Sequence, residues 1–222
     1  IIVGSGLGSE PRVHVLRLDG SEIGSFLAYD PTVQSGISVA ACDLDGDGNK
    51  EIITAPARGQ SPDVRLFDRY GTPLNINVLP YQKTFRGGVN LACGNILGDA
   101  RDELVTLPGA GGGPHVRIWN LQDQTLDLVD EWFAFDANDR RGMVGVVSEK
   151  KLFVVQQKTQ TPLIKTYLFD PNRILIDEQQ LSIHENGIAS MVIHNQTIFL
   201  STTSGAMMYD VAHHLSTKIS DA

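Results

Sequence analysis

The sequence has few features that would assign it to a membrane or nucleic-acid-binding class. Its 222 residues contain no apolar run that approaches the roughly 18 residues of a membrane span. Acidic residues outnumber basic ones, 26 against 18, which gives a formal net charge of −8. The composition therefore argues against membrane insertion and against nonspecific binding to nucleic acid.

The sequence also lacks the motifs of common catalytic and nucleotide-binding sites. It contains neither a Gly-x-Ser-x-Gly elbow nor a His-Glu-x-x-His pair. The glycine-rich stretch 109–113 is followed by no helical pattern and no lysine of the kind that a phosphate-binding loop requires. Helical periodicity is missing from the apolar segments. We therefore expect an all-β protein that is not an enzyme.

Cysteine is scarce, because the chain has only Cys42 and Cys93. When the repeat described below is aligned, Cys93 matches Ala41 and Cys42 matches Gly94, so the two cysteines occupy neighbouring but not equivalent positions. No dense cysteine framework is present, so we expect two small buried thiols, with a disulfide as the alternative. Two cysteines do not identify the cellular compartment.

What the sequence does have is an internal repeat of about fifty residues. Its most similar copies are 58–68 and 109–120, and an earlier copy covers 6–16. A degraded copy ends at Tyr167. Each copy has a proline at the same point, and these prolines are Pro11, Pro62, Pro114 and Pro162. A fixed period of this length predicts stacked supersecondary units.

Each repeat contains four short runs with strand character. In the second unit, strands are predicted at 37–41, 51–55 and 63–67, separated by an acidic turn and a Gly/Pro loop. The fourth strand ends in an aromatic segment, whose copies are 26–29, 78–81 and 132–135. Four antiparallel strands per repeat are typical of a β-propeller blade.

We therefore expect one β-propeller domain over 1–222, with about four to five blades on this chain. The predicted blade units are 1–30 (partial), 36–83, 88–136, 142–184 and 187–211 (partial). The chain begins within a unit, at Ile1, so we also expect it to be a processed or truncated segment of a larger propeller, with a five-bladed body whose end blades are irregular as the alternative.

The acidic turn of the second unit is the sharpest chemical motif. If the turn curls, oxygen atoms from five residues can converge on one point; these residues are Asp43, Asp45, Asp47, Asn49 and Glu51. A hard cation with six to eight oxygen ligands suits this set, and Ca²⁺ suits it better than Mg²⁺, which keeps its waters. The alternative is a polar Asp/Gly turn that holds no ion. In the next unit Asn95 and Leu97 replace the first two aspartates, so we expect one strong site per chain.

These residues resemble the FG-GAP repeat, the blade of integrin α-chain propellers and of many bacterial and archaeal surface proteins. The resemblance depends on the acidic turn 43–51, on the string 111–117 and on the aromatic segments near Tyr29, Tyr81 and Phe135. It implies calcium at the acidic turn and an extracellular or cell-surface location. It also implies adhesion, ligand binding or carbohydrate recognition, and some members of the family are accessory domains of enzymes.

Basic residues recur at one position of the third strand of each unit. They are His14, Arg65, Arg117 and Lys165. One interpretation is an outer face of ion pairs, with Asp19, Asp68 and Asp170 nearby in the sequence. The other is a ring of cations that binds an anionic ligand such as a sialylated or uronic glycan.

Our leading hypothesis is a noncatalytic, calcium-binding β-propeller module for recognition or adhesion at the cell surface. Its partner would be a protein or glycan ligand, and other propeller segments or subunits of the same protein are further candidates. One alternative is an accessory or catalytic domain of a carbohydrate-active enzyme. Another is an architectural component of a surface layer or filament.

Overall fold

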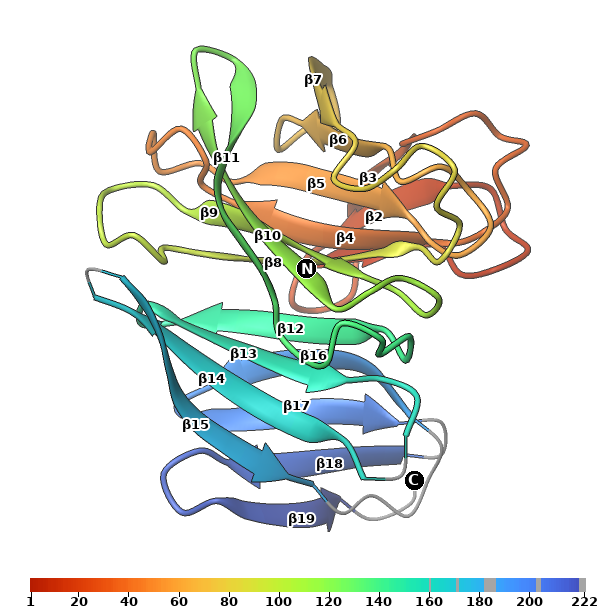
Figure 1. Cartoon of the computed structure of the whole chain (residues 1–222). Helices are drawn as coiled ribbons and strands as arrows, with labels where there is room; N and C mark the ends of the chain where they lie inside the picture. The colour runs from red at the N-terminus through yellow and green to blue at the C-terminus, as the bar shows by residue number, and fades with distance from the viewer. Residues whose placement is uncertain (160, 171, 182–186, 203–204, 220–222) are drawn as a thin grey trace.

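The computed structural model describes residues 1–159, 161–170, 172–181, 187–202 and 205–219. Within these ranges every regular element is a β-strand (Figure 1). The strands form five antiparallel sheets in chain order, the first with three strands and the others with four. The prediction of an all-β propeller built from four-stranded antiparallel blades is confirmed. The described part of the chain contains no helix that is long and apolar enough to cross a membrane.

Each sheet is a meander in which consecutive strands pair. The first sheet consists of β1 (Ile2–Gly4), β2 (Arg12–Leu16) and β3 (Glu22–Leu27). The second consists of β4 (Ile37–Cys42), β5 (Glu51–Pro56), β6 (Val64–Phe67) and β7 (Pro73–Val78). The third consists of β8 (Val89–Gly94), β9 (Glu103–Pro108), β10 (His115–Gln122) and β11 (Thr125–Phe133). The fourth consists of β12 (Met143–Ser148), β13 (Lys151–Gln156), β14 (Leu163–Phe169) and β15 (Arg173–Gln180). The fifth consists of β16 (Ile188–His194), β17 (Thr197–Thr202), β18 (Gly205–Asp210) and β19 (Leu215–Ile219).

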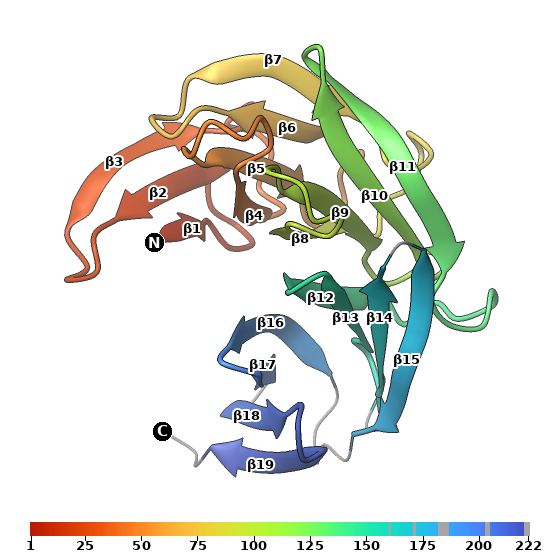
Figure 2. The ribbon, with the colours of Figure 1, turned by 90° about the vertical axis from the view of Figure 1, so that its left-hand side faces the viewer.

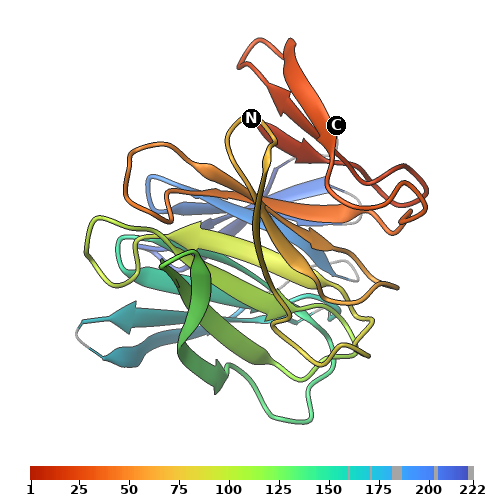
Figure 3. The same ribbon diagram turned by 90° about the horizontal axis from the view of Figure 1, so that it is seen from above.

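The five sheets are arranged as a fan around a common axis. Figure 2 shows the first strand of each sheet on the inside of the fan and the last strand on the outside. Both chain ends lie on the side where the fan is open, and the view from above places β1–β3 at one end of the row (Figure 3). The turn between β4 and β5 lies close to the turn between β8 and β9 of the next sheet, because the backbone N–H of Asp102 donates to the carbonyl of Asp43 at 2.8 Å.

The hydrophobic core lies between the sheets. One cluster joins Cys42 and Leu44 of the second unit to Leu104 and Trp119 of the third. Three further clusters join the first sheet to the second, the third to the fourth and the fourth to the fifth. A single small sheet cannot cover both of its own faces, so each blade is stabilised by its neighbours.

The last unit is more complete than the sequence indicated. We expected a partial blade over 187–211, but β19 adds a fourth strand after a turn at 211–214. His213 and His214 lie in that turn, and His214 has a φ of 54°. The strand was missed because Leu-Ser-Thr-Lys-Ile is short and has little apolar alternation. The first unit has three strands over the range 1–30.

A repeated contact connects each of the first blades to the next. The aromatic residue after the last strand of one blade lies beneath a cation on the third strand of the following blade. Arg65 lies 4.5 Å from the ring centre of Tyr29, and Arg117 lies 5.8 Å from that of Tyr81. The tyrosine hydroxyl groups also donate hydrogen bonds across the interface, from Tyr29 to the carbonyl of Asp63 at 2.7 Å and from Tyr81 to that of His115 at 2.9 Å. The aromatic segments therefore hold adjacent blades together.

The substitution Tyr81→Phe tests this contact. It keeps the ring but removes the hydroxyl donor, which leaves the His115 carbonyl without that partner. We expect the free energy of unfolding to fall by about 1–2 kcal/mol, measured by urea denaturation. Tyr70→Phe is the matched control because Tyr70 is 74% exposed. Equal losses in the two variants would contradict an interface role for Tyr81.

Candidate metal centre

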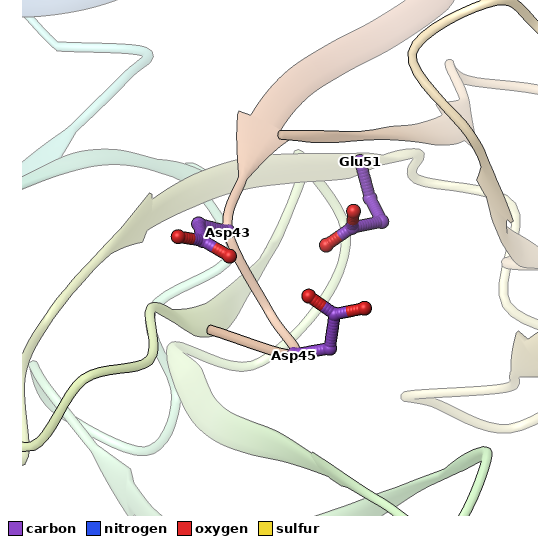
Figure 4. Close-up of side chains that lie close together, drawn as sticks. All are labelled: Asp43, Asp45 and Glu51. Carbon is purple, nitrogen blue, oxygen red and sulfur yellow. The ribbon is translucent and has the colours of Figure 1, made fainter. Parts of the chain in front are cut away.

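The acidic turn follows β4 and leads into β5, and it brings three of its carboxylates together. Asp43, Asp45 and Glu51 each offer an oxygen, and these atoms lie within 4.8 Å of one another. Figure 4 shows the three side chains around a shared space, with Asp43 and Asp45 on the turn and Glu51 at the start of β5. Asp45 is exposed, Asp43 is partly buried and Glu51 is buried. The space between the three carboxylates is therefore accessible to solvent on the side of Asp45.

Local hydrogen bonds fix the shape of this turn. The Asp43 carboxylate accepts from the backbone N–H of Gly46 at 2.9 Å and of Gly48 at 3.1 Å. Glu51 Oε2 accepts from the N–H of Leu44 at 2.9 Å. The carboxylates therefore converge because the backbone curls around them, with Gly46 and Gly48 at positive φ.

Of the other two predicted ligands, Asp47 is not part of the three-carboxylate cluster, and Asn49 is hydrogen-bonded to Asp47. Asp47 accepts hydrogen bonds from the backbone and side-chain nitrogens of Asn49, at 2.7 and 3.0 Å. The side-chain bond to Asn49 is the main cause that holds the pKa of Asp47 below its ordinary value. The side-chain oxygen of Asn49 in turn accepts from Arg69 at 2.5 Å.

Sequence reasoning missed Asp102, which anchors the acidic turn from the next blade. Its Oδ2 accepts from the backbone N–H of Asp43 at 3.0 Å and forms an ion pair with Lys50, also at 3.0 Å. The backbone N–H of Asp102 donates to the carbonyl of Asp43 at 2.8 Å. No local signal could have identified it, because Asp102 lies on the corresponding turn of the neighbouring repeat.

The corresponding turn 95–103 shows which parts of the arrangement need no ion. Asn95 accepts from the N–H of Gly98 as Asp43 does from Gly46, at 2.6 Å. Glu103 Oε2 accepts from the N–H groups of Ile96 and Leu97, at 2.8 and 3.0 Å. The curl therefore forms without the first two aspartates. What distinguishes 43–51 is its additional negative charge, which the curl itself does not require.

Burial makes Glu51 and Glu103 poor hosts for a negative charge. Glu51 is 7% exposed and Glu103 is 1% exposed. Desolvation is the main cause that raises the pKa of both carboxyl groups above the ordinary value, and nearby aspartates add to it. Within the described residues, Glu103 Oε1 has no hydrogen-bond partner. A cation at the acidic turn would oppose this effect at Glu51, whereas within the part of the chain that the structure describes Glu103 belongs to no group of three converging carboxylates.

The raised pKa of Glu103 predicts a pH dependence of stability. A carboxyl group with a raised folded-state pKa stabilises the fold fully below its unfolded pKa, about 4.3, and this contribution is lost as pH rises through the folded value. Glu103→Gln cannot ionise, so we expect it to gain stability relative to the wild type between pH 4.5 and pH 7.5. Thermal unfolding at both pH values measures this. The exposed Glu149→Gln is the control, and an equal pH response in both variants would contradict the assignment.

The two cysteines form a disulfide, contrary to the prediction of free thiols. Cys42 at the end of β4 and Cys93 on β8 have Cα atoms 5.8 Å apart, within the usual range for a disulfide. The offset of one residue between them did not prevent pairing, because the inner strands of neighbouring blades lie side by side. The bridge joins two blades immediately before Asp43.

The row of basic residues on the third strands is ion-paired. His14 pairs with Glu22 at 2.8 Å, and Lys165 pairs with Glu178 at 2.9 Å. The two arginines pair with Asp63 and Glu131, both at 2.8 Å. These acids differ from the ones expected from the sequence, since three of the four lie on the adjacent outer strand. The ion-paired interpretation therefore describes this row.

No family model and no curated protein matches this sequence. Solved structures are similar in fold. A protein of unknown function from Desulfotomaculum acetoxidans DSM 771 aligns with 99% of this chain, at a TM-score of 0.60 and 11% identity. A candidate 6-phosphogluconolactonase from Bacteroides fragilis NCTC 9343 aligns with 98%, at 0.57 and 15%. Dihydro-heme d1 dehydrogenase NirN aligns with 97%, at 0.51 and 16%.

The aligned structures are longer than this chain. It covers 65% of the first two and 42% of NirN. At these identities the likeness concerns architecture and carries no activity. The comparisons and the five sheets together establish that this chain has the β-propeller fold.

Proposed function

We propose that this chain is a calcium-stabilised, noncatalytic β-propeller module that presents its loops for recognition at the cell surface. The convergence of Asp43, Asp45 and Glu51 is the observation that supports it best. Two oxygens that both bind Ca²⁺ at about 2.4 Å are at most about 4.8 Å apart, so the spacing of the three oxygens fits one ion.

The chemistry of the donors also fits Ca²⁺. All three are carboxylates, and a buried glutamate beside two aspartates gains stability from a cation. The ion would hold the turn between β4 and β5 against Asp102 of the next blade. Its role would be structural, because the calcium supplies charge and a fixed loop shape rather than a reacting group.

Calcium is expected to raise the melting temperature. At a concentration about 100-fold above Kd, binding to the folded state alone adds about 2.7 kcal/mol, which corresponds to about 5–10 °C for a chain of this size. The measurement is thermal unfolding by circular dichroism with Ca²⁺, with Mg²⁺ and with EDTA. Equal melting temperatures in the three conditions would contradict the proposal.

The turn 95–103 supplies matched variants for this experiment. Asp43→Asn keeps the acceptor that Asn95 uses toward Gly98, but it removes a charge. We expect this variant, and Asp45→Asn, to lose most of the calcium response. Asp99→Asn on the neighbouring turn should keep the full response. A calcium response that survives in both variants of the acidic turn would place the ion elsewhere.

A further inference from the structure

A cavity of about 650 Å³ lies between the second and third blades, at the end of β9 opposite to the acidic turns. It is bounded by the segment after β7, by the glycine-rich loop after β9 and by the segment after β11. The side chains and backbone that matter below are those of Phe85, Gly113, His115, Phe133 and Arg140. Its volume is in the range of sites that hold a small ligand.

One wall of the cavity is aromatic and open to solvent. Phe133 is 53% exposed, although it is a large apolar side chain next to a concave surface. Its ring lies 4.8 Å from that of His115 at an angle of 36°, which fixes its orientation. On the other side, the ring of Phe85 packs against Tyr81 at 5.7 Å. An oriented, exposed phenyl face suits the apolar C–H face of a flat ring.

The cavity also contains a cation without a carboxylate partner. One nitrogen of Arg140, Nη1, donates to the backbone carbonyls of Ala137 and Asp139 at 2.7 and 2.8 Å. Among the described residues Arg140 forms no ion pair, whereas Arg117, which also lines the cavity, is paired with Glu131. A guanidinium has five N–H donors, so Arg140 retains donors for a planar carboxylate.

His115 adds a group that can bind a hydroxyl. Its Nε2 lies 3.0 Å from Glu131. Burial is the main cause that lowers the pKa of His115, which favours the neutral ring. A neutral ring that donates from Nε2 to a carboxylate has an acceptor at Nδ1. This acceptor lies on the side chain that stacks against Phe133.

The glycine-rich loop provides space rather than a phosphate cradle. The N–H of Gly111 donates to the backbone carbonyl of Arg140 at 2.8 Å, and the N–H of Gly112 donates to that of Gly109 at 3.2 Å. Both amides therefore already have an acceptor. A Cβ at Gly113 would lie 3.5 Å from the Phe133 ring and 3.7 Å from Arg140 Nη1. Because residue 113 is a glycine, the region between the Phe133 ring and the Arg140 guanidinium stays open.

We propose that this cavity binds an acidic pyranose, such as a uronic or sialic acid residue of a glycan. The sugar ring lies on Phe133, its carboxylate pairs with Arg140 and a hydroxyl donates to His115. An aromatic platform beside one uncompensated guanidinium favours a ring that carries both C–H faces and a carboxylate. The inference rests on the proposed recognition function, to which it assigns a site and a ligand class.

Calorimetric titration with glucuronic acid and N-acetylneuraminic acid tests the proposal, with glucose as the neutral counterpart. We expect at least one acid to bind with a Kd of about 1 mM or lower and glucose to bind at least tenfold more weakly. Arg140→Gln and Phe133→Ala should each weaken binding of the acid at least tenfold. Gly113→Val should abolish it by filling the cavity.

Two matched variants separate binding from folding. Arg86 makes the same pair of backbone contacts in the preceding turn, to Lys83 and Phe85, so Arg86→Gln reproduces the structural change of Arg140→Gln. Leu27 is 36% exposed and occupies the position of Phe133 in the first blade, so Leu27→Ala is the control for Phe133→Ala. Both controls should bind the acid as the wild type does.

Several results would overturn the proposal. These are no binding of either acid at 10 mM, equal binding of glucose, or binding that Arg140→Gln and Phe133→Ala leave unchanged. Competition of the acid by a short acidic peptide with higher affinity would reassign the cavity to a protein partner. The titrations are made in Ca²⁺ and in EDTA at a temperature where the protein is folded in both. If the sugar binds but the melting temperature is the same with Ca²⁺ and with EDTA, the metal site is refuted and the sugar site is not.

Discussion

Loss of the disulfide between Cys42 and Cys93 is expected to lower the free energy of unfolding by about 4 kcal/mol. The bridge spans a sequence separation of 51 residues. In the chain-entropy account, a cross-link over a loop of this length lowers the conformational entropy of the unfolded chain, which is worth about 4 kcal/mol of free energy at 25 °C. In the folded state it joins β4 to β8, so it also restrains two neighbouring blades at their inner strands. The melting temperature should fall by about 10 °C.

Denaturation by urea with and without dithiothreitol measures this loss. The double variant Cys42→Ala/Cys93→Ala should show the reduced stability in both conditions, so reductant should act on the wild type alone. Alkylation under denaturing, nonreducing conditions gives an independent readout, because a disulfide protects both residues from modification. Two alkylated cysteines in the untreated protein would contradict the bridge, and a reductant effect below about 1 kcal/mol would contradict the predicted size of its contribution.

The disulfide also shows where sequence reasoning stops. The proline spacing and the alternating apolar residues were enough to identify strands and the radial packing of sheets. They did not reveal how far the inner strand of one blade is shifted relative to that of the next. That shift depends on side-chain packing across the interface, and it decides that Cys42 and Cys93 meet although they are not equivalent in the repeat.

The second strands illustrate a similar limit. β5 and β9 are buried at every position, because they lie between two neighbouring sheets and have no solvent face. Alternation therefore disappears in them, and only their flanking turns mark their ends. β19 was hard to predict for the opposite reason: its five residues contain too few apolar side chains to mark it as a strand. Length and turn chemistry predicted the central blades better than the last strand.

For the acidic turn, the sequence identified the residue types and their order but not their final positions. The structure brings Asp43, Asp45 and Glu51 together and ties Asp47 to Asn49. Spacing along the chain cannot decide between these outcomes, because each aspartate can instead accept a hydrogen bond from a backbone N–H two or three residues later. The anchoring residue, Asp102, becomes visible only when the blades are assembled.

The substitution Gly109→Ala is expected to destabilise the fold by about 3 kcal/mol or more. Gly109 follows β9 and lies against the segment that precedes β8, where its N–H donates to the carbonyl of Gly88 at 2.9 Å. A Cβ at this position would lie 2.2 Å from the carbonyl oxygen of Gly87. Since the Cβ is held rigidly by its own Cα and the oxygen belongs to the backbone, no side-chain rotation can relieve the contact, and the backbone itself must shift. Overpacking of this kind typically costs 1–3 kcal/mol and sometimes more.

The repeat supplies a control at the same position in another blade. Gly6 lies five residues before Pro11, as Gly109 lies five before Pro114, and a Cβ at Gly6 would have no atom within 4 Å. Gly6→Ala should therefore leave the urea midpoint close to that of the wild type, while Gly109→Ala should lower it strongly. Equal midpoints for the two variants would mean that the close backbone contact between 87 and 109 does not stabilise the fold. An unequal result would instead show that the glycine at 109 is required by the close approach of the segments flanking β8 and β9 within the third blade, because the two variants share only the repeat position.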